Sequence, residues 1–218
     1  MNVTEAARLV LSRHPAYVEC LRRGVANHSA ISRRIYGEVA ELIGEKPEFE
    51  TLKMAVIRIG KQLQAEGTEV EERVREVLAN STIELKADVA VVTVRTRSLH
   101  GVAELLKSLR SRFVQVTQGV DSITIAFDRR DYEDVMRKMD PRNIVGLFEN
   151  QAAIILISPE EIIGTPGVIA FVTNFLSNNG INLTQIISCH TDTIFVVGKE
   201  ESVRAYELLK ELIEGMRG

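Results

Sequence analysis

The sequence has few of the residues from which disulfide frameworks and metal sites are built. Only two cysteines occur among 218 residues, Cys20 and Cys189, and they fall in different parts of the chain. This argues against a disulfide framework and favours a reduced, cytoplasmic setting. The four histidines show no metal-ligand spacing, so no metal site is predicted. They are His14, His28, His100 and His190.

Motifs for nucleotide chemistry and for membrane insertion are also missing. The sequence has no glycine loop of the Walker or dinucleotide-binding type, and no apolar run approaches the length of a membrane span. The N-terminus is unlike a signal peptide. Cys189 and His190 are adjacent in a predicted strand, so their side chains would point to opposite faces and not pair. We therefore predict no catalytic residue, no cofactor and no membrane partner, and we do not expect an enzyme.

The composition is typical of a folded protein with several domains. Hydrophobic residues make up 45% of the chain, which is enough for packed cores and argues against long disordered segments. A chain of 218 residues is expected to form two or three small domains. The net charge of −3 argues against a nonspecific binder of polyanions.

Residues 1–80 show almost no strand-like alternation and are predicted to form an all-helical domain. Asn27 or Ser29 can cap a helix that Gly44 ends, and Pro15 and Pro47 can each begin one. The other predicted helices cover residues 4–12, 15–23, 47–63 and 69–78. Asn80-Ser81 marks the boundary with the segments that follow.

Two interpretations of this helical domain remain open. It is either a helix-turn-helix-like DNA-binding domain or an interaction domain whose arginines are simply solvated. Residues 29–35 resemble the short helix of helix-turn-helix folds, in which small residues permit close packing. The DNA contacts would then come from Arg33, Arg34, Lys53, Arg58 and Lys61. Residues 1–65 hold ten Lys and Arg against seven Asp and Glu, a balance of about +3, whereas typical DNA-binding domains are more basic.

Residues 151–218 have the pattern of a small α+β domain. An apolar stripe at helical spacing runs from Val168 to Leu176, and Asn179-Gly180 is suited to end that helix. Strands are predicted at 152–157, 181–187 and 193–197, and a second helix at 202–216. A sheet covered on one face by the two helices would bury their apolar stripes.

The start of the first of these helices is the strongest candidate for a binding site. In Thr165-Pro166-Gly167-Val168-Ile169, the proline can take the first helical position without losing a hydrogen bond, and the glycine allows a ligand to come close. The first N–H groups of a helix lack intrahelical partners and lie at the positive end of its dipole. We therefore expect the N–H groups near Gly167, Val168 and Ile169 to bind a small metabolite through a carboxylate or hydroxyl.

The stretch from Ile162 to Val197 resembles the ACT domain, and it is most similar to the second ACT domain of aspartokinases. The matching elements are the Pro166-Gly167-Val168 helix start, Gly180-Ile181-Asn182 before the next strand, and Ile187-Ser188. ACT domains are small regulatory modules with a ferredoxin-like fold, and many bind amino acids at domain or subunit interfaces. Where many effector-binding members have an Asp before the Pro-Gly, this sequence has Thr165. No kinase domain is present, so the likeness covers only the regulatory part of aspartokinases.

The resemblance implies further ligand-binding side chains. The Asn182 amide offers both a donor and an acceptor, and Thr165 and Ser188 could add hydroxyls at the rim of the site. The alternative interpretation is that Asn182 only caps the turn from Gly180, and that Pro166-Gly167 only shapes the loop.

A weaker copy of the same pattern lies upstream, in residues 86–150. Its helical stripe begins at Val102, which precedes Val168 by 66 residues. Strands are predicted at 89–94, 113–117 and 123–127, with a helix over 132–139, and residues 143–150 can add a further strand. Leu99-His100-Gly101 stands where Thr165-Pro166-Gly167 stands later, and no Asn matches Asn182, so no ligand site is predicted here.

Together these patterns predict an α+β protein with three domains. They are an N-terminal helix-turn-helix-like domain (1–80), a degenerate ACT-like domain (86–150) and an ACT domain (151–218), the last two with a ferredoxin-like βαββα(β) fold. The expected function is a transcription regulator that senses a metabolite, such as an amino acid, and binds duplex DNA. The alternative is a regulatory or interaction subunit of a metabolic enzyme that binds no DNA. Because each short sheet has edge strands, a homo-oligomer through the ACT domains is also expected.

Overall fold

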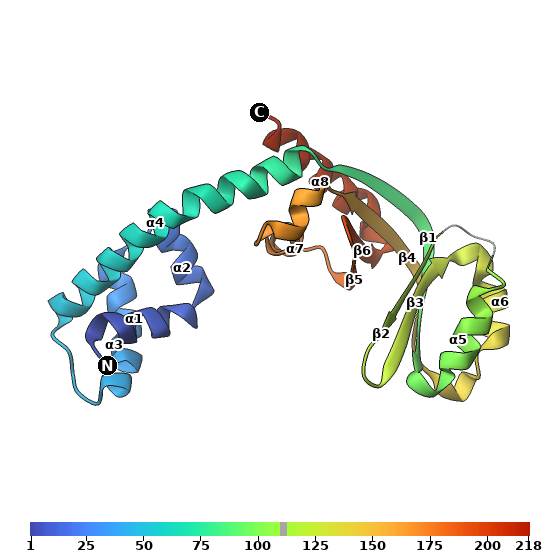
Figure 1. The fold of residues 1–218 in the computed structure, drawn as a ribbon, viewed down its shortest axis with the longest axis horizontal. Helices are drawn as coiled ribbons and strands as arrows, with labels where there is room; N and C mark the ends of the chain where they lie inside the picture. The colour runs from blue at the N-terminus through green and yellow to red at the C-terminus, as the bar shows by residue number, and fades with distance from the viewer. Residues whose placement is uncertain (110–112) are drawn as a thin grey trace. The chain divides into compact units, whose positions relative to one another are not determined.

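The structure, a computed structural model, describes residues 1–109 and 113–218, without the side chains of residues 66–69. The chain divides into two compact units, residues 1–73 and residues 74–218. Helix α4 (Phe49–Ala79) contributes residues to both units (Figure 1).

The N-terminal unit is built from α1 (Val3–Ser12), α2 (Pro15–Arg22), α3 (His28–Ile43) and the first part of α4. Local chemistry explains where these helices begin. At α1, the Asn2 side chain accepts from the Glu5 N–H and the Glu5 carboxylate accepts from the Asn2 N–H. At α3, the Asn27 side chain accepts from the Ala30 N–H at 3.0 Å. All four helices contribute apolar side chains to one core.

Helix α3 has the bounds predicted from Asn27 and Gly44, and residues 29–35 lie in its first half. Helix α4 is longer than the sequence indicated. The helices predicted at 47–63 and 69–78 form one continuous helix of 31 residues. No proline interrupts the backbone hydrogen bonds between the two segments. The side chain of Glu69, where the second helix was expected to begin, lies outside the described residues.

The second unit contains one antiparallel sheet of six strands in the order β2-β3-β1-β4-β6-β5. The strands are β1 (Thr82–Arg95), β2 (Val114–Gln118), β3 (Ser122–Asp128), β4 (Ile144–Ile157), β5 (Leu183–Cys189) and β6 (Asp192–Gly198). The helices are α5 (Leu99–Leu106), α6 (Tyr132–Lys138), α7 (Val168–Asn178) and α8 (Ser202–Met216). The predicted α+β class and the predicted order of strands and helices are confirmed.

The two central strands are each 14 residues long and belong to both halves of the sheet (Figure 1). β1 pairs with β3 only through Val89–Arg95, and β4 pairs with β6 only through Gln151–Ile157. The remaining parts of β1 and β4 pair with each other's second half. The first half consists of β2, β3, the second part of β1 and residues 144–150 of β4. The second half consists of β5, β6, the second part of β4 and residues 82–88 of β1. Each half therefore has four strands in the same order. The further strand predicted at 143–150 is confirmed as the first part of β4, whereas the strand at 82–88 was not predicted.

Bulges and ion pairs mark the place where the halves join. The β1–β4 register shifts on either side of Val89, and Asp88 has a φ of +57°. Turn η5 (Lys199–Glu201) places Lys199 Nζ 2.6 Å from Asp88 Oδ1. Turn η2 (Arg129–Asp131) places Arg129 Nη1 2.8 Å from Glu149 Oε2 on β4. Each turn thus holds the part of a central strand that serves as the fourth strand of its own half.

Helices cover one face of the sheet, and apolar side chains fill the other. α7, α8 and the end of α4 pack against β4 and β6, while α5 and α6 pack against β1 and β3. A further buried cluster lies on the opposite face and draws on both halves. It consists of Val89, Val91, Phe113, Ala126, Ala153, Ile187, Ile194 and Val196. The halves therefore share a core as well as strands.

The two exposed glycines of α3 should respond to alanine in opposite directions. Gly44 ends the helix with a φ of +77°, so Gly44→Ala should lower stability by about 1 kcal/mol or more. Gly37 lies inside the helix with nothing within 4 Å of an added Cβ. Gly37→Ala should raise stability by up to about 1 kcal/mol, because alanine has the higher helix propensity. Thermal unfolding followed by circular dichroism tests the pair, and shifts of the same sign would contradict the assigned end of α3.

Asp128 should make stability depend on pH. Its side chain is 4% exposed and lies 2.7 Å from Lys86 Nζ and 2.9 Å from Arg130 Nη2. The hydrogen bond from Arg130, aided by Lys86, holds the pKa of Asp128 far below its usual value, although burial acts in the opposite direction. The stabilisation is therefore present above the unfolded-state pKa and is lost as the pH falls below about 4.

Asp128→Asn should accordingly cost about 1–3 kcal/mol at pH 7, and this cost should shrink as the pH approaches 3. Denaturant unfolding at several pH values measures it. Asp140→Asn is the matched control, because the Asp140–Arg142 pair lies at the surface, with side chains 38% and 87% exposed. A difference between wild type and Asp128→Asn that does not change with pH would contradict the ion pair.

Candidate functional site

The candidate ligand site lies at the N-terminal end of α7. The chain leaves β4, makes turn η4 (Glu160–Gly164) and reaches α7 through Thr165, Pro166 and Gly167. Gly167 has a φ of +98°, and its carbonyl accepts from the Phe171 N–H at 2.8 Å. No side chain caps the helix. Its first N–H groups therefore have neither an intrahelical partner nor a side-chain cap.

The residues of this loop differ in their environments. Pro166 lies two positions before the first helical residue, so the prediction that it occupies that position is wrong. Thr165 is buried, and its hydroxyl donates to the Glu161 carbonyl at 2.7 Å. Val168 is 1% exposed in the core beneath the loop, whereas Ile169 is half-buried. The accessible groups are Pro166, Gly167 and the backbone of the first helical turn.

The end of α4 lies beside this loop. Val74 belongs to the same buried cluster as Val168, and its Cγ2 would lie 3.7 Å from a Cβ added at Gly167. Arg217 fastens the chain end to α4 by donating to the carbonyls of Ala79 and Ser81 at 2.8 and 2.9 Å. Sequence reasoning placed residues 69–78 with the helical domain and so missed this contact. The apolar residues of segment 69–78 were the only feature of the sequence that could have indicated this contact.

Asn182 and Ser188 lie at different ends of α7. Asn182 follows the end of the helix, which Gly180 closes with a φ of +76°. Because the 11 residues of α7 span about 16 Å, a small ligand cannot touch both Gly167 and Asn182 of one copy. Ser188 is exposed and pairs with Thr193, which pairs with Leu156 near the end of β4. Ser188 is therefore at the same end of the sheet as the Gly167 loop.

The Asn182 side chain is exposed and makes no hydrogen bond to the described part of the chain. Asn179 contributes to the closing turn instead, since its Nδ2 donates to the Phe175 carbonyl at 2.8 Å. The interpretation that Asn182 only caps the turn therefore has no contact in its favour.

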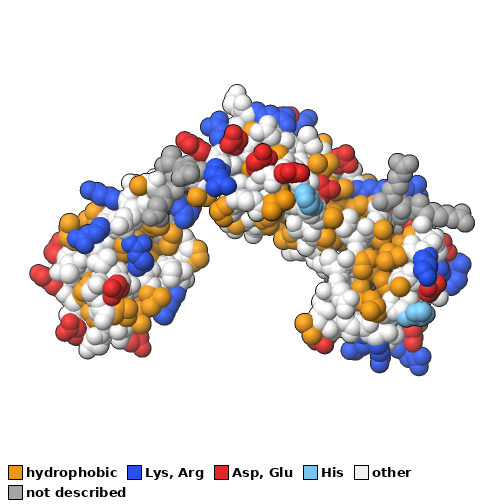
Figure 2. All heavy atoms as spheres, viewed as in Figure 1, with side chains coloured by type: hydrophobic (Ala, Val, Ile, Leu, Met, Phe, Trp, Pro, Cys, Tyr) orange, Lys and Arg blue, Asp and Glu red, His pale blue; other side chains and the backbone are white. Residues whose placement is uncertain are grey.

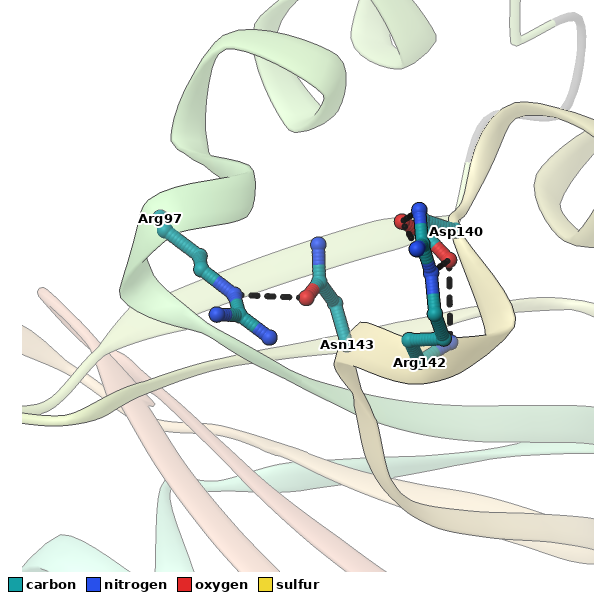
Figure 3. A network of polar contacts seen from close by, with 4 residues as sticks. All are labelled: Arg97, Asp140, Arg142 and Asn143. Atoms are coloured by element: carbon teal, nitrogen blue, oxygen red, sulfur yellow. Dashed lines mark hydrogen bonds and ion pairs between the residues drawn. The ribbon is translucent and has the colours of Figure 1, made fainter.

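The corresponding helix start in the first half is built differently. α5 begins at Leu99, so that Gly101 lies inside its first turn and does not cap it. Turn η1 (Thr96–Ser98) before it is held by Arg97, whose Nε donates to Asn143 Oδ1 at 2.6 Å (Figure 3). Asp140 and Arg142 form an ion pair with three side-chain contacts next to Asn143 (Figure 3). Polar side chains thus hold the turn before α5, although no side chain caps the start of either α5 or α7.

The five basic residues considered for DNA binding lie on two helices of the N-terminal unit. Arg33 and Arg34 are exposed on α3, and Arg58 and Lys61 are exposed three residues apart on α4. Lys53 is half-buried and pairs with Glu50 at 3.1 Å. Figure 2 shows Lys and Arg side chains interspersed with Asp and Glu on the visible face of this unit.

Neither a metal site nor a membrane helix is found in the described part of the chain. No group of three or more His, Cys, Asp or Glu among those residues could hold a metal ion. No helix searched in the same residues is long and apolar enough to cross a bilayer.

Comparison with known proteins concerns the second unit above all. Residues 148–211 match the family model of the ACT domain, a stretch that contains both Gly167 and Asn182. No curated protein sequence matches the chain.

Several solved structures have a similar fold. Aspartate kinase from Synechocystis is 19% identical with a TM-score of 0.51, over 65% of this chain and 28% of that one. Aspartate kinase from Clostridium acetobutylicum is 15% identical with a TM-score of 0.50, over 61% of this chain and 34% of that one. This chain therefore spans about a third of these enzymes or less. Residues 148–211 match the ACT domain family, and the chain shares its α+β fold with part of aspartate kinases.

Proposed function

We propose that the protein is a ligand-responsive regulator in which the start of α7 binds a small metabolite, an amino acid or a similar molecule. The observation that carries this proposal is the uncapped helix start, led by a left-handed glycine, inside the segment that matches the ACT domain. The helix dipole favours a negative group at that position, and no acidic residue occupies the first turn of α7. The metabolite would bind through its carboxylate or hydroxyl.

The separation of Gly167 from Asn182 favours a site that is completed by a second copy of the chain. β5 is an edge strand, and Ile186 on it is 46% exposed. A homo-oligomer through this part of the molecule would cover that edge and could bring Asn182 of one copy to the helix start of another. Under this proposal the first half of the sheet is a degenerate ACT-like domain without a ligand site of its own.

The helical unit would carry the output of the regulator. In the preferred form it binds duplex DNA through Arg33, Arg34, Arg58 and Lys61, with Lys53 partly engaged by Glu50. The mixed charge visible in Figure 2 instead favours the second candidate, a regulatory subunit that binds a protein partner and no DNA. Cys20 and Cys189 are both free and exposed, which fits a reduced, cytoplasmic setting.

A screen of the twenty amino acids and common sugars by thermal shift tests the ligand proposal directly. A metabolite that binds only the folded state raises the unfolding temperature, and the shift keeps growing as its concentration rises above Kd. A screen in which no compound shifts the unfolding temperature would count against the site.

Charge at the helix start should control binding of the metabolite found in that screen. The obvious substitution, Val168→Asp, is unsuitable because Val168 is buried. Ala170 is exposed in the first turn, so Ala170→Asp sets a carboxylate beside the N–H groups while favouring the helix. We expect it to weaken binding about tenfold or more without loss of stability, whereas Ala170→Asn, the neutral isostere, should bind much more tightly than Ala170→Asp. Calorimetric titration measures both, and equal affinities would place the ligand elsewhere.

Asn182→Ala should cost about 1–3 kcal/mol of binding free energy if the amide contacts the ligand. If the site lies between copies, an equal mixture of Asn182→Ala and Ala170→Asp should regain about a quarter of the wild-type sites after dimers re-form at random. Mixed dimers would be half of the total, with one intact site in each. A mixture that regains no sites would show that both residues act on the ligand from one copy.

The DNA proposal predicts a change in salt dependence. Replacing Arg58 and Lys61 together with Ala should weaken binding to all sequences and reduce the slope of log K against log salt by about two units. Lys210→Ala on α8, outside the helical unit, is the control and should leave the slope unchanged. Fluorescence anisotropy with duplex DNA over a range of salt concentrations measures the slope. Wild-type protein that binds no genomic fragment would favour the interaction subunit.

A further inference from the structure

The N-terminal unit contains a hollow of about 440 Å³ between α1, α2 and α4, within the size range of small-molecule sites. Leu11, Val18, Ile59 and Leu63 give it an apolar floor. Leu11 and Ile59 are almost fully buried in the core of this unit, whereas Val18 and Leu63 are half-buried at its edge. The apolar surface that a ligand can reach in the hollow therefore comes mainly from Val18 and Leu63.

The mouth of the hollow is positively charged. Arg8 of α1 lines it, and its Nη2 donates to the side-chain oxygen of Gln62, a neutral partner. Arg22 also lines it, but shares the Glu19 carboxylate with Arg23, at 3.0 and 2.6 Å. Glu19 lines the hollow too, so Arg8 and Arg22 against this one carboxylate leave a net charge of +1 at the mouth. An anionic group is the complement of this surface.

We infer that this hollow binds a small amphipathic carboxylate, with its alkyl or ring portion on the apolar floor and its carboxylate on Arg8. A guanidinium recognises a carboxylate through two parallel hydrogen bonds, and the Gln62 amide can be displaced at little electrostatic cost. A protein partner would typically cover about 800 Å² of each surface, far more than this hollow offers. The site is in a different unit from the α7 helix start and does not depend on the function proposed for it.

Octanoate is a suitable probe for the whole chain, measured by calorimetric titration well below the concentration at which it forms micelles. We expect one saturable site in the N-terminal unit. Hexanoate should bind more weakly by about fourfold for each methylene removed, because each methylene on the floor contributes to burial. The neutral analogue 1-octanol should bind about tenfold more weakly or worse, because it cannot pair with Arg8.

Three variants locate the site. Arg8→Gln should lower octanoate affinity by about tenfold or more, since it removes the charged partner at the exposed mouth. Arg13→Gln is the matched control, because Arg13 is an exposed arginine at the end of α1 that does not line the hollow, and this variant should bind as wild type. Ala170→Asp, which tests the α7 site, should also leave octanoate binding unchanged.

Four results would overturn the inference: no saturable binding, equal affinity for octanoate and 1-octanol, no effect of Arg8→Gln, or an equal loss in Arg13→Gln. Binding that is lost in Ala170→Asp and kept in Arg8→Gln would assign octanoate to the α7 helix start. That result would contradict this inference and would support the proposed function. Conversely, a metabolite screen without a hit leaves the prediction for the hollow unaffected.

Discussion

The pairing of β1 with β4 is the constraint on which the rest of the second unit depends. Each strand is 14 residues long and serves as the first strand of one half and the fourth strand of the other. Without residues 144–150, the first half would keep only three strands, and without residues 82–88 so would the second. The positions of α5 to α8 follow from the β1–β4 pairing, because each of these helices packs on strands that this pairing aligns.

A shared pair of strands also makes the halves mechanically dependent on each other. The buried cluster on the face without helices joins Val91 and Ala126 of the first half with Ala153 and Val196 of the second. Next to the bulges, Lys199 contacts Asp88 within the second half, and Arg129 contacts Glu149 within the first half. Such exposed pairs contribute little stability on their own, so we assign them to fixing the register at the bulges. A change at α7 therefore acts on a sheet whose central strands belong to both halves.

The sequence predicted local structure well, but it did not predict how segments distant in the chain pack together. The helix at 202–216 and the helix ends at Asn27 and Gly44 were predicted correctly, because caps and apolar stripes are local signals. The strand at 82–88 was missed because the bulge at Asp88 adds a residue. The side chains of β1 that face the helix-covered core are therefore at an odd position before the bulge, Ile83, and at even positions after it, Ala90 and Val92. A search for alternating apolar residues fails across such a change. The helix between Gly167 and Asn182 was predicted, but a site that joins both residues in one copy ignored the length of that helix.

The environment of the α7 helix start links the candidate site to α4. The α5 helix start of the first half is held by Arg97 and Asn143, whereas that of α7 meets the apolar side chain of Val74. Val74 is buried in the same core as Val168, so the start of α7 and the end of α4 pack together within the second unit. Because α4 is one helix of 31 residues, a displacement of Val74 is also a displacement of the backbone that enters the N-terminal unit. A ligand bound under the proposed function at Gly167 would therefore lie beside the end of α4, where Val74 packs against the loop.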